Sequence, residues 1–347
     1  MAEAGITLLT SPTLPLYRHP WLQLKRLLKM LGALVRGRPE RALGLWRGGH
    51  PSVTRSLLAG LRTLGVPCNL NPLRQKQVFP WVLVLSGLEA LEQAIRLKNK
   101  GLIQVLWAGP NLVVTPTGSG SVLHHPAIDR VVVPSDWVLQ KYAGLAPALE
   151  QRLVVWPAGV DCEGYWKPRA SRKELKDASP IRDGAPIVLH FNKLNPQMSS
   201  AWEPLLQTCI QHIQQQGWRQ HQIRYGQFSQ ASYRRWLQRA DLVIYWSDEG
   251  ESQGLALAEA WAMDVPTLVS ANHHACFAGV PCSVSTAPYL TPSCGALFST
   301  WQQLQQQLDG ALGASSSPYA PRQWLQQNLS DAASAAHLMA LAQQHQG

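Results

Sequence analysis

The first half of the chain alternates short apolar runs with longer stretches of helical spacing. The apolar runs are rich in β-branched residues, which favours buried strands, and the stretches between them repeat apolar side chains every three or four positions. Strands are expected at 6–9, 42–46, 81–86, 103–107, 130–135 and 152–157, and helices at 52–65 and 86–100. This alternation is typical of βαβ units around a mostly parallel sheet.

A polar segment at 166–186, punctuated by Pro and Gly, interrupts this pattern, which then begins again. Strands are expected at 187–191, 222–226, 241–247 and 266–271, and helices at 201–215, 231–239, 254–263 and 301–308. The chain is therefore expected to hold an N-terminal Rossmann-like α/β domain at 1–170 and a second one at 175–318. A helical stretch within 319–347 is expected to pack back on the first domain.

Two such domains in tandem are expected to face each other across a cleft. In α/β folds ligands bind at the carboxyl ends of the strands, where helix N-termini attract phosphates. A nucleotide-linked ligand is therefore expected.

Composition and charge narrow the choice of partner. The chain has 347 residues, of which 46% are hydrophobic and 15% charged, and this excludes a disordered, collagen-like or coiled-coil protein. Between Trp21 and Pro80 there are 11 Lys and Arg and one acid, which matches the whole chain's net charge of +10. Such a segment attracts phosphates of a nucleotide, an anionic lipid or a nucleic acid. Readers of nucleic-acid bases are not found, so a nucleic-acid-binding protein is the less favoured alternative.

Cysteine usage and the N-terminal segment bear on localisation. The six Cys are far apart and form no C-x-x-C pair, which predicts reduced thiols. The segment MAEAG does not lead from basic into apolar residues, and no apolar run is long enough to span a membrane. A cytoplasmic protein is expected.

Residues 21–37 are predicted to form an amphipathic helix. Its apolar positions are 21, 24, 27, 28, 31, 34 and 35, and Lys25, Arg26, Lys29 and Arg36 lie outside that stripe. The segment can be an ordinary domain helix with a solvated basic face. Alternatively, it can lie on the anionic inner face of a membrane and make peripheral contact near a lipid-linked acceptor.

The stretch 241–270 carries the chemistry, with a strand, an acidic loop, a helix and a strand in that order. Gly254 lies where the helix begins, and the free N–H groups near Gly254 and Leu255 favour anionic oxygens. Glu251 precedes the helix and Glu259 lies two turns inside it, in the pattern E-x7-E. Ionised carboxylates accept hydrogen bonds from sugar hydroxyls, so the stretch is predicted to hold a phosphate with sugars bracketed by the two acids. The alternative is a pair of solvated carboxylates.

The same residues resemble a known family. ESQGLALAEAWA followed by Val-Pro is similar to the donor-site signature E-G-F-G-L-x-x-x-E-A-x-A-x-G-x-P of the group 1 (family 4) retaining glycosyltransferases of GT-B fold. The matching residues are Glu251, Gly254, Leu255, Glu259, Ala260, Ala262 and Pro266. The stretches 130–142 and 152–168 also resemble the family's domain boundary, so the likeness covers about 130–310.

The resemblance implies a role for each matching residue. Glu259 would bind the ribose hydroxyls, Glu251 would lie against the transferred sugar, and the amides after Gly254 would contact the diphosphate. Ser252, Gln253 and Leu255 would complete the donor site. The implied activity is metal-independent transfer of a hexosyl-type sugar from a nucleotide-sugar to a glycan, lipid-linked or other hydroxyl acceptor, with retention, in polysaccharide biosynthesis.

One family stretch is altered in this sequence. Where the family has G-R-L-x-x-x-K-G, residues 192–199 are NKLNPQMS, so Lys193 stands for the Arg and Met198 occupies the Lys position. A well-placed charge at a leaving group is commonly worth about 3 kcal/mol. The loss of one cation therefore leaves open a catalytically inactive sugar-nucleotide or glycan-binding protein on the same scaffold.

Candidates on the acceptor side come from the first domain. Gly48 and Gly49 form a turn before an expected helix, and the resemblance implies that His124 or His125 could lie near the acceptor, although surface-loop histidines are the alternative. His273, His274, Cys276 and Cys282 do not have an accepted zinc spacing. No metal and no other cofactor is expected.

Overall fold

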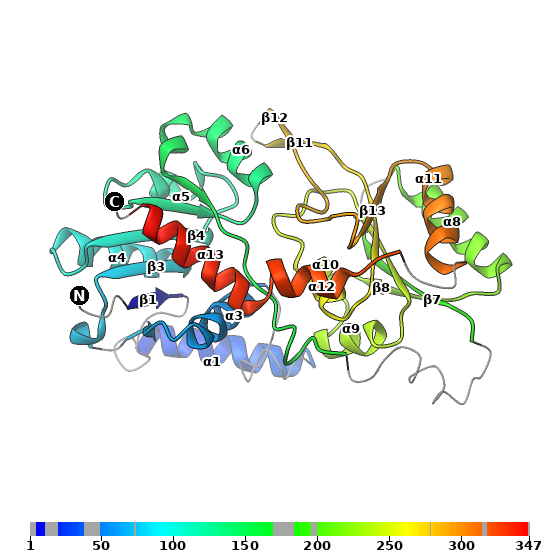
Figure 1. Cartoon of the computed structure of the whole chain (residues 1–347). Helices are drawn as coiled ribbons and strands as arrows, with labels where there is room; N and C mark the ends of the chain where they lie inside the picture. The colour runs from blue at the N-terminus through cyan, green and yellow to red at the C-terminus, as the bar shows by residue number, and fades with distance from the viewer. Residues whose placement is uncertain are drawn as a thin grey trace. The chain divides into compact units, whose positions relative to one another are not determined.

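The computed structural model describes residues 5–10, 20–37, 49–72, 74–168, 184–195, 200–277, 279–313 and 318–345. The chain divides into two compact units, drawn in Figure 1. Unit 1 comprises Met1–Pro134, Tyr142–Trp156 and Ala335–Gly347, and unit 2 comprises Ser135–Lys141 and Pro157–Ser334. None of the helices in the described ranges has both the length and the apolar character needed to cross a bilayer.

Unit 1 is built on a six-stranded sheet in the order β2-β1-β3-β4-β5-β6, and its strands pair in parallel. The strands are β1 (Ile6–Leu9), β2 (Cys68–Leu70), β3 (Trp81–Ser86), β4 (Val105–Asn111), β5 (Arg130–Val133) and β6 (Leu153–Val155). The helices are α1 (Pro20–Val35), α3 (His50–Thr63), α4 (Leu88–Asn99) and α5 (Gly118–Ser121). Helix α6 (Asp136–Leu145) begins in unit 2 and continues into unit 1 at Tyr142. Every residue of β3 is buried, so its uninterrupted apolar run belongs to a strand covered on both faces.

Unit 2 is built on a five-stranded parallel sheet in the order β13-β10-β9-β7-β8. The strands are β7 (Ile187–Lys193), β8 (Arg219–Arg224), β9 (Leu242–Ser247), β10 (Thr267–Ser270) and β13 (Gly295–Phe298), and β11 (His274–Phe277) and β12 (Val280–Ser283) form a separate antiparallel hairpin. The helices are α8 (Glu203–Gln215), α9 (Gln230–Leu237), α10 (Leu255–Ala262), α11 (Trp301–Leu312) and α12 (Pro321–Asn328). Helix α13 (Asp331–Gln344) begins in unit 2 and continues into unit 1 at Ala335.

The sheet of unit 2 has a core on each face because side chains alternate along its strands. Tyr245 of β9 packs in one core with Phe191 and Trp261. Its neighbour Trp246 packs in the other core with Phe298. Strand β9 is therefore buried on both sides.

The C-terminal segment, all of which (319–347) was expected to pack on the first domain, is divided between the two units. Helix α12 packs on α10, where Trp324 and Trp261 meet edge to face at 5.7 Å, so residues to Ser334 belong to unit 2. Most of α13, from Ala335 onward, belongs to unit 1, where the His345 ring lies 6.2 Å from that of Trp107. The boundary expected at 170 lies at Trp156 instead.

Candidate ligand site at the carboxyl ends of β7 and β9

The strand order of unit 2 defines one place in its sheet where a ligand can enter. If the strands of this sheet are numbered 1 to 5 along the chain, their order in the sheet is 2-1-3-4-5. The chain passes from β7 to β8 on one side and then crosses to β9 on the other side of β7. The helices that follow two such strands lie on opposite faces and leave a crevice at the strands' carboxyl ends. Lys193 ends β7, Ser247 ends β9, and the two residues are paired in register.

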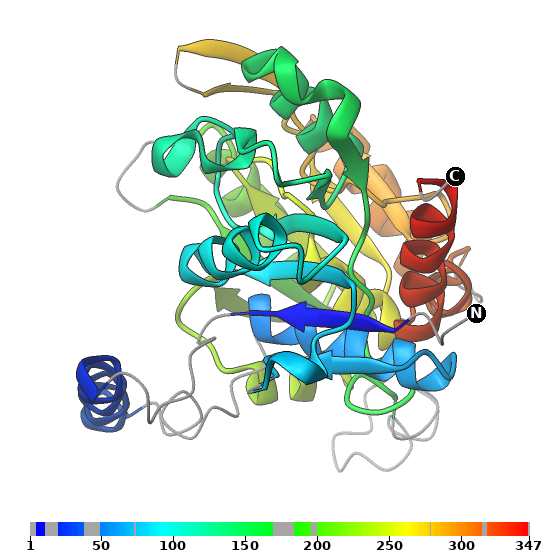
Figure 2. The ribbon, with the colours of Figure 1, turned by 90° about the vertical axis from the view of Figure 1, so that its left-hand side faces the viewer.

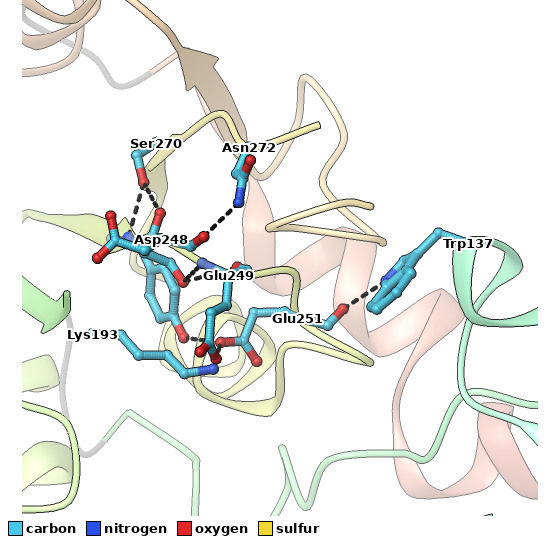
Figure 3. A network of polar contacts seen from close by, with 9 residues as sticks. Trp137, Lys193, Asp248, Glu249, Glu251, Ser270 and Asn272 are labelled. Atoms are coloured by element: carbon cyan, nitrogen blue, oxygen red, sulfur yellow. Dashed lines mark hydrogen bonds and ion pairs between the residues drawn. The ribbon is translucent and has the colours of Figure 1, made fainter. Parts of the chain in front are cut away.

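Lys193 and Glu251 meet at this switch point (Figure 3). The Lys193 ammonium lies 2.5 Å from Glu251 Oε1, and the Tyr245 hydroxyl donates to the same oxygen at 2.7 Å. Lys193 is 17% exposed and Glu251 15%, so the pair is largely shielded but still reached by solvent. The site predicted from sequence thus contains a cation and a carboxylate in direct contact.

The protonation states in this cluster are set by burial and by Glu251. Burial lowers the pKa of Lys193, but the Glu251 charge and hydrogen bond, with Tyr225 and Glu249, outweigh it and raise that pKa. Burial, together with the charge of Glu251, holds the pKa of Tyr245 well above its ordinary value. Both donors therefore keep their protons at neutral pH.

Hydrogen bonds fix the loop that follows β9. The Ser270 hydroxyl accepts from Ser247 N at 2.9 Å, and Asn272 donates to the Asp248 carbonyl at 2.6 Å. The Asp248 carboxylate accepts from Asn195 N at 3.1 Å and from the Ser200 hydroxyl at 2.5 Å. The first part of the loop is therefore tied to β10 and to the residues that follow β7.

The second part of the loop is tied to the start of α6, in the segment that belongs to unit 2. The Trp137 indole donates to the Glu251 carbonyl at 2.8 Å, and the Ser135 hydroxyl donates to the Ser252 carbonyl at 2.6 Å (Figure 3 shows the indole). A Cβ at Gly250 would come within 2.8 Å of Val284, so this position requires glycine. The Glu251 backbone is therefore held in place without a ligand.

The turn into α10 has the geometry expected at Gly254. Gly254 is the N-cap, with φ 76° and ψ 47°, a left-handed conformation that glycine adopts without strain. Its carbonyl accepts from the amides of Leu257 and Ala258 at 3.0 and 3.1 Å. The amides of the preceding residues in the first turn have no intrahelical acceptor, because an α-helix cannot supply one there. They carry the positive end of the helix dipole, which favours an anion.

Glu259 lies inside α10 and has a partner that the sequence did not indicate. Its side chain is buried, and the Gln230 amide at the start of α9 donates to it at 3.3 Å. Burial holds the pKa of Glu259 well above its ordinary value. The Gln230 carbonyl oxygen is buried without a hydrogen-bond partner among the described residues. Glu251 and Glu259 thus occupy two different polar environments on either side of the helix start.

The remaining residues predicted for the donor site differ in exposure. Ser252 is exposed and Leu255 is half-buried at the first position of α10. Gln253 is buried, and its amide donates to the Ala158 carbonyl at 2.5 Å. The side chain of Gln253 therefore anchors the loop to the Ala158 carbonyl.

Three of the predicted acceptor-side residues, Gly49, His124 and His125, lie in the described part of unit 1. Gly48 lies outside the described residues, as does Met198 of the donor side. Gly49 is the exposed N-cap of α3, with φ 53°. His125 Nδ1 accepts from Ala127 N at 3.1 Å, and His124 Nε2 is buried without a hydrogen-bond partner among the described residues.

Unit 1 has a switch point of its own that the sequence did not reveal. Its strand order places it between β1 and β3. There the Thr10 and Ser86 hydroxyls share a hydrogen bond of 2.6 Å, and Asn71 Oδ1 accepts from Thr10 N at 2.9 Å. These polar residues follow single strands without a recognisable spacing, so only the sheet topology identifies them.

Four residues that were weighed as metal ligands lie on or beside the β11–β12 hairpin: His273, His274, Cys276 and Cys282. Cys276 is opposite Pro281 and Cys282 is opposite Ala275, so the two thiols are not cross-strand partners. In the ranges that the structure describes, no three His, Cys, Asp or Glu side chains gather as a metal-binding group.

Solved structures of two other proteins align with this chain over nearly its whole length. HepE from Anabaena in complex with UDP aligns with a TM-score of 0.55 at 11% identity, over 98% of this chain and 100% of that one. Its complex with UDP-glucose aligns with a TM-score of 0.54 at 11% identity, over 98% and 99%. A glycosyltransferase from Rickettsia africae aligns with a TM-score of 0.50 at 12% identity, over 99% of both chains.

The fold is GT-B. The expected α/β class, with two Rossmann-like sheets, is confirmed. No protein-family model matches the sequence, and no curated protein matches it significantly. At 11–12% identity the likeness to HepE and the Rickettsia protein establishes the GT-B architecture alone.

Proposed function

We propose that this chain is a glycosyltransferase that takes its sugar from a nucleotide-sugar bound by unit 2. The observation that carries the proposal is the contact of Lys193 with Glu251 beside the N-terminus of α10. This places a cation, free amide donors and a carboxylate at one switch point of a GT-B fold. The diphosphate would take the amides and Lys193, and sugar hydroxyls would take Glu251.

UDP is the first nucleotide to test, because UDP and UDP-glucose are bound in HepE, which has the same architecture. In the proposed pose Glu259 accepts from the ribose hydroxyls, as the family resemblance implies. Gln230, which already donates to Glu259, would then offer its unpartnered carbonyl oxygen to a ligand donor.

The proposed chemistry is transfer with retention of anomeric configuration and without an essential metal. The bond from the anomeric carbon to the diphosphate breaks while an acceptor hydroxyl attacks on the same face. Lys193 and the first-turn amides stabilise the charge on the leaving diphosphate, a type of stabilisation worth about 3 kcal/mol for each well-placed donor. The acceptor is proposed to be a glycan, a lipid-linked saccharide or another hydroxyl compound.

The decisive experiment is a calorimetric and thermal-shift titration with UDP, GDP and ADP and their common sugars. Glu259→Ala should weaken nucleotide binding at least about tenfold, because a hydrogen-bond acceptor for the ribose hydroxyls is lost. Glu203→Ala, which removes an exposed acid from the first turn of α8, is the matched control and should change nothing. Silence with every nucleotide, or unchanged affinity in Glu259→Ala, would refute the proposed site.

Turnover separates the enzyme from the second candidate, an inactive sugar-nucleotide or glycan-binding protein. That candidate is favoured by Met198, which stands where the family resemblance implies a lysine. Release of sugar and UDP from a bound donor, at a rate unaffected by EDTA, supports the enzyme. Proton NMR of the product would then give the anomeric configuration. Tight binding without any release supports the inactive protein.

A further inference from the structure

Helix α1 exposes an apolar face. Six of its side chains are between 45% and 87% exposed: Leu24, Leu27, Leu28, Leu31, Leu34 and Val35. At about 100° per residue, these six positions fall within an arc of about 120°, which makes one continuous stripe. Figure 2 shows α1 in dark blue, standing apart from the strands of unit 1.

The stripe is not the ordinary scatter of apolar atoms on a protein surface. Thirteen large apolar side chains are exposed among the described residues, and six of them lie on this one helix. The others are spread singly, as Leu64, Leu102 and Val114 are. Isolated exposed leucines are normal, whereas a contiguous patch of this kind marks a surface that contacts something apolar. The ordinary domain helix, which buries its apolar side, is therefore the alternative that the structure disfavours.

Charge identifies what contacts the stripe. Residues 20–37 include Lys25, Arg26, Lys29 and Arg36 and no acid. A second copy packed stripe to stripe would cover the leucines, but it would leave these cations, which helical spacing places outside the stripe, without an anionic partner. An anionic bilayer offers hydrocarbon for the leucines and phosphate groups for the cations in one surface.

We propose that α1 docks the protein on an anionic membrane surface, with its leucine face in the interface and its axis parallel to the bilayer. A helix of this length cannot span the bilayer, but it can lie in the boundary between headgroups and chains. Each basic residue near such a surface adds to the attraction, and salt screens that part alone. The proposal does not depend on the donor site in unit 2.

The test is co-sedimentation of the full chain with phosphatidylcholine vesicles, with and without phosphatidylglycerol. Wild type should bind the anionic vesicles and bind phosphatidylcholine alone far more weakly. The double variant Leu27→Gln/Leu31→Gln should lose about tenfold or more in apparent partitioning, because two buried leucines are worth at least that factor. Leu64→Gln/Leu102→Gln, which removes two exposed leucines that lie outside α1, should bind as wild type does.

The basic residues are tested separately with Lys25→Gln/Lys29→Gln. This variant should bind anionic vesicles less well than wild type, and its binding should depend less steeply on salt concentration. Equal thermal melting of all variants establishes that they fold. Three results would overturn the proposal: no binding of wild type to anionic vesicles, equal losses in the two leucine variants, or vesicle-free self-association that Leu27→Gln/Leu31→Gln abolishes. UDP titration of each variant keeps this result separate from the donor-site proposal.

Discussion

Breaking the contact between Lys193 and Glu251 should destabilise unit 2 strongly. At their 2.5 Å separation the direct attraction is about 7 kcal/mol for an effective dielectric constant of about 20, but desolvation of both groups offsets most of it. The measurable quantity is the loss in the free energy of unfolding when one of the two shielded charges is left without its partner. Glu251→Gln strands the Lys193 ammonium, and we expect a loss of about 3 kcal/mol in the free energy of unfolding.

A double-mutant cycle measures this coupling. Glu251→Gln, Lys193→Met and the double variant are unfolded in urea and followed by tryptophan fluorescence. The double variant should lose clearly less stability than the two single losses added together. Arg96 and Glu92 on α4 are the control pair, since they are 3.8 Å apart, 70% and 63% exposed, and should couple by less than about 0.5 kcal/mol. A Lys193–Glu251 coupling no larger than that of the control would refute the reasoning.

Three further predictions concern the same unit. Burial lowers the pKa of His190 to about 4, so the protein loses stability as the pH falls from 6.5 toward 4, where the unfolded chain binds a proton that the folded one does not. The loss in the free energy of unfolding is about 3 kcal/mol. Urea midpoints measured between pH 7 and 4.5 should fall less for His190→Asn than for wild type. Trp137→Phe removes the donor to the Glu251 carbonyl and should cost about 1 kcal/mol on thermal unfolding, with weaker UDP binding in calorimetry. Gly254→Ala places a Cβ at φ 76° and 3.2 Å from Leu257, and should cost about 1–2 kcal/mol in the same melt; an unchanged melt would contradict the left-handed turn.

The fold was predictable where strands are buried on both faces. The apolar runs of β3, β7 and β9 predicted strands at nearly the observed bounds. Strand β8 was placed three residues late, at 222–226, because only Ile223 of Arg219–Arg224 is buried and an edge strand of this kind has no apolar run. The hairpin and β13 were not predicted for the same reason, since their backbone pairing leaves little trace in short or exposed sequences.

The candidate site was predictable only in its local part. The spacing around Gly254 predicted the turn, and Lys193 was indicated by the family resemblance of residues 192–199. Tyr245, Gln230 and Trp137 were not predicted, because their contacts arise from strand register and packing between distant segments. Tyr245 belongs to an apolar run whose periodicity indicates core, and nothing in that run shows that its hydroxyl reaches the strand end.

The prior engagement of Lys193 by Glu251 has a consequence for ligand selection. An anion that draws the ammonium away leaves a shielded carboxylate that has lost its main neutralising partner, and Tyr245 alone does not replace the lost charge. Inorganic phosphate has few donors for the Glu251 carboxylate. A molecule with hydroxyls next to its phosphates can bind Lys193 through a phosphate and donate hydrogen bonds to Glu251 through a hydroxyl. In the proposed donor site, the Lys193–Glu251 salt bridge would therefore favour binding of diphosphates that carry a sugar over binding of simpler anions.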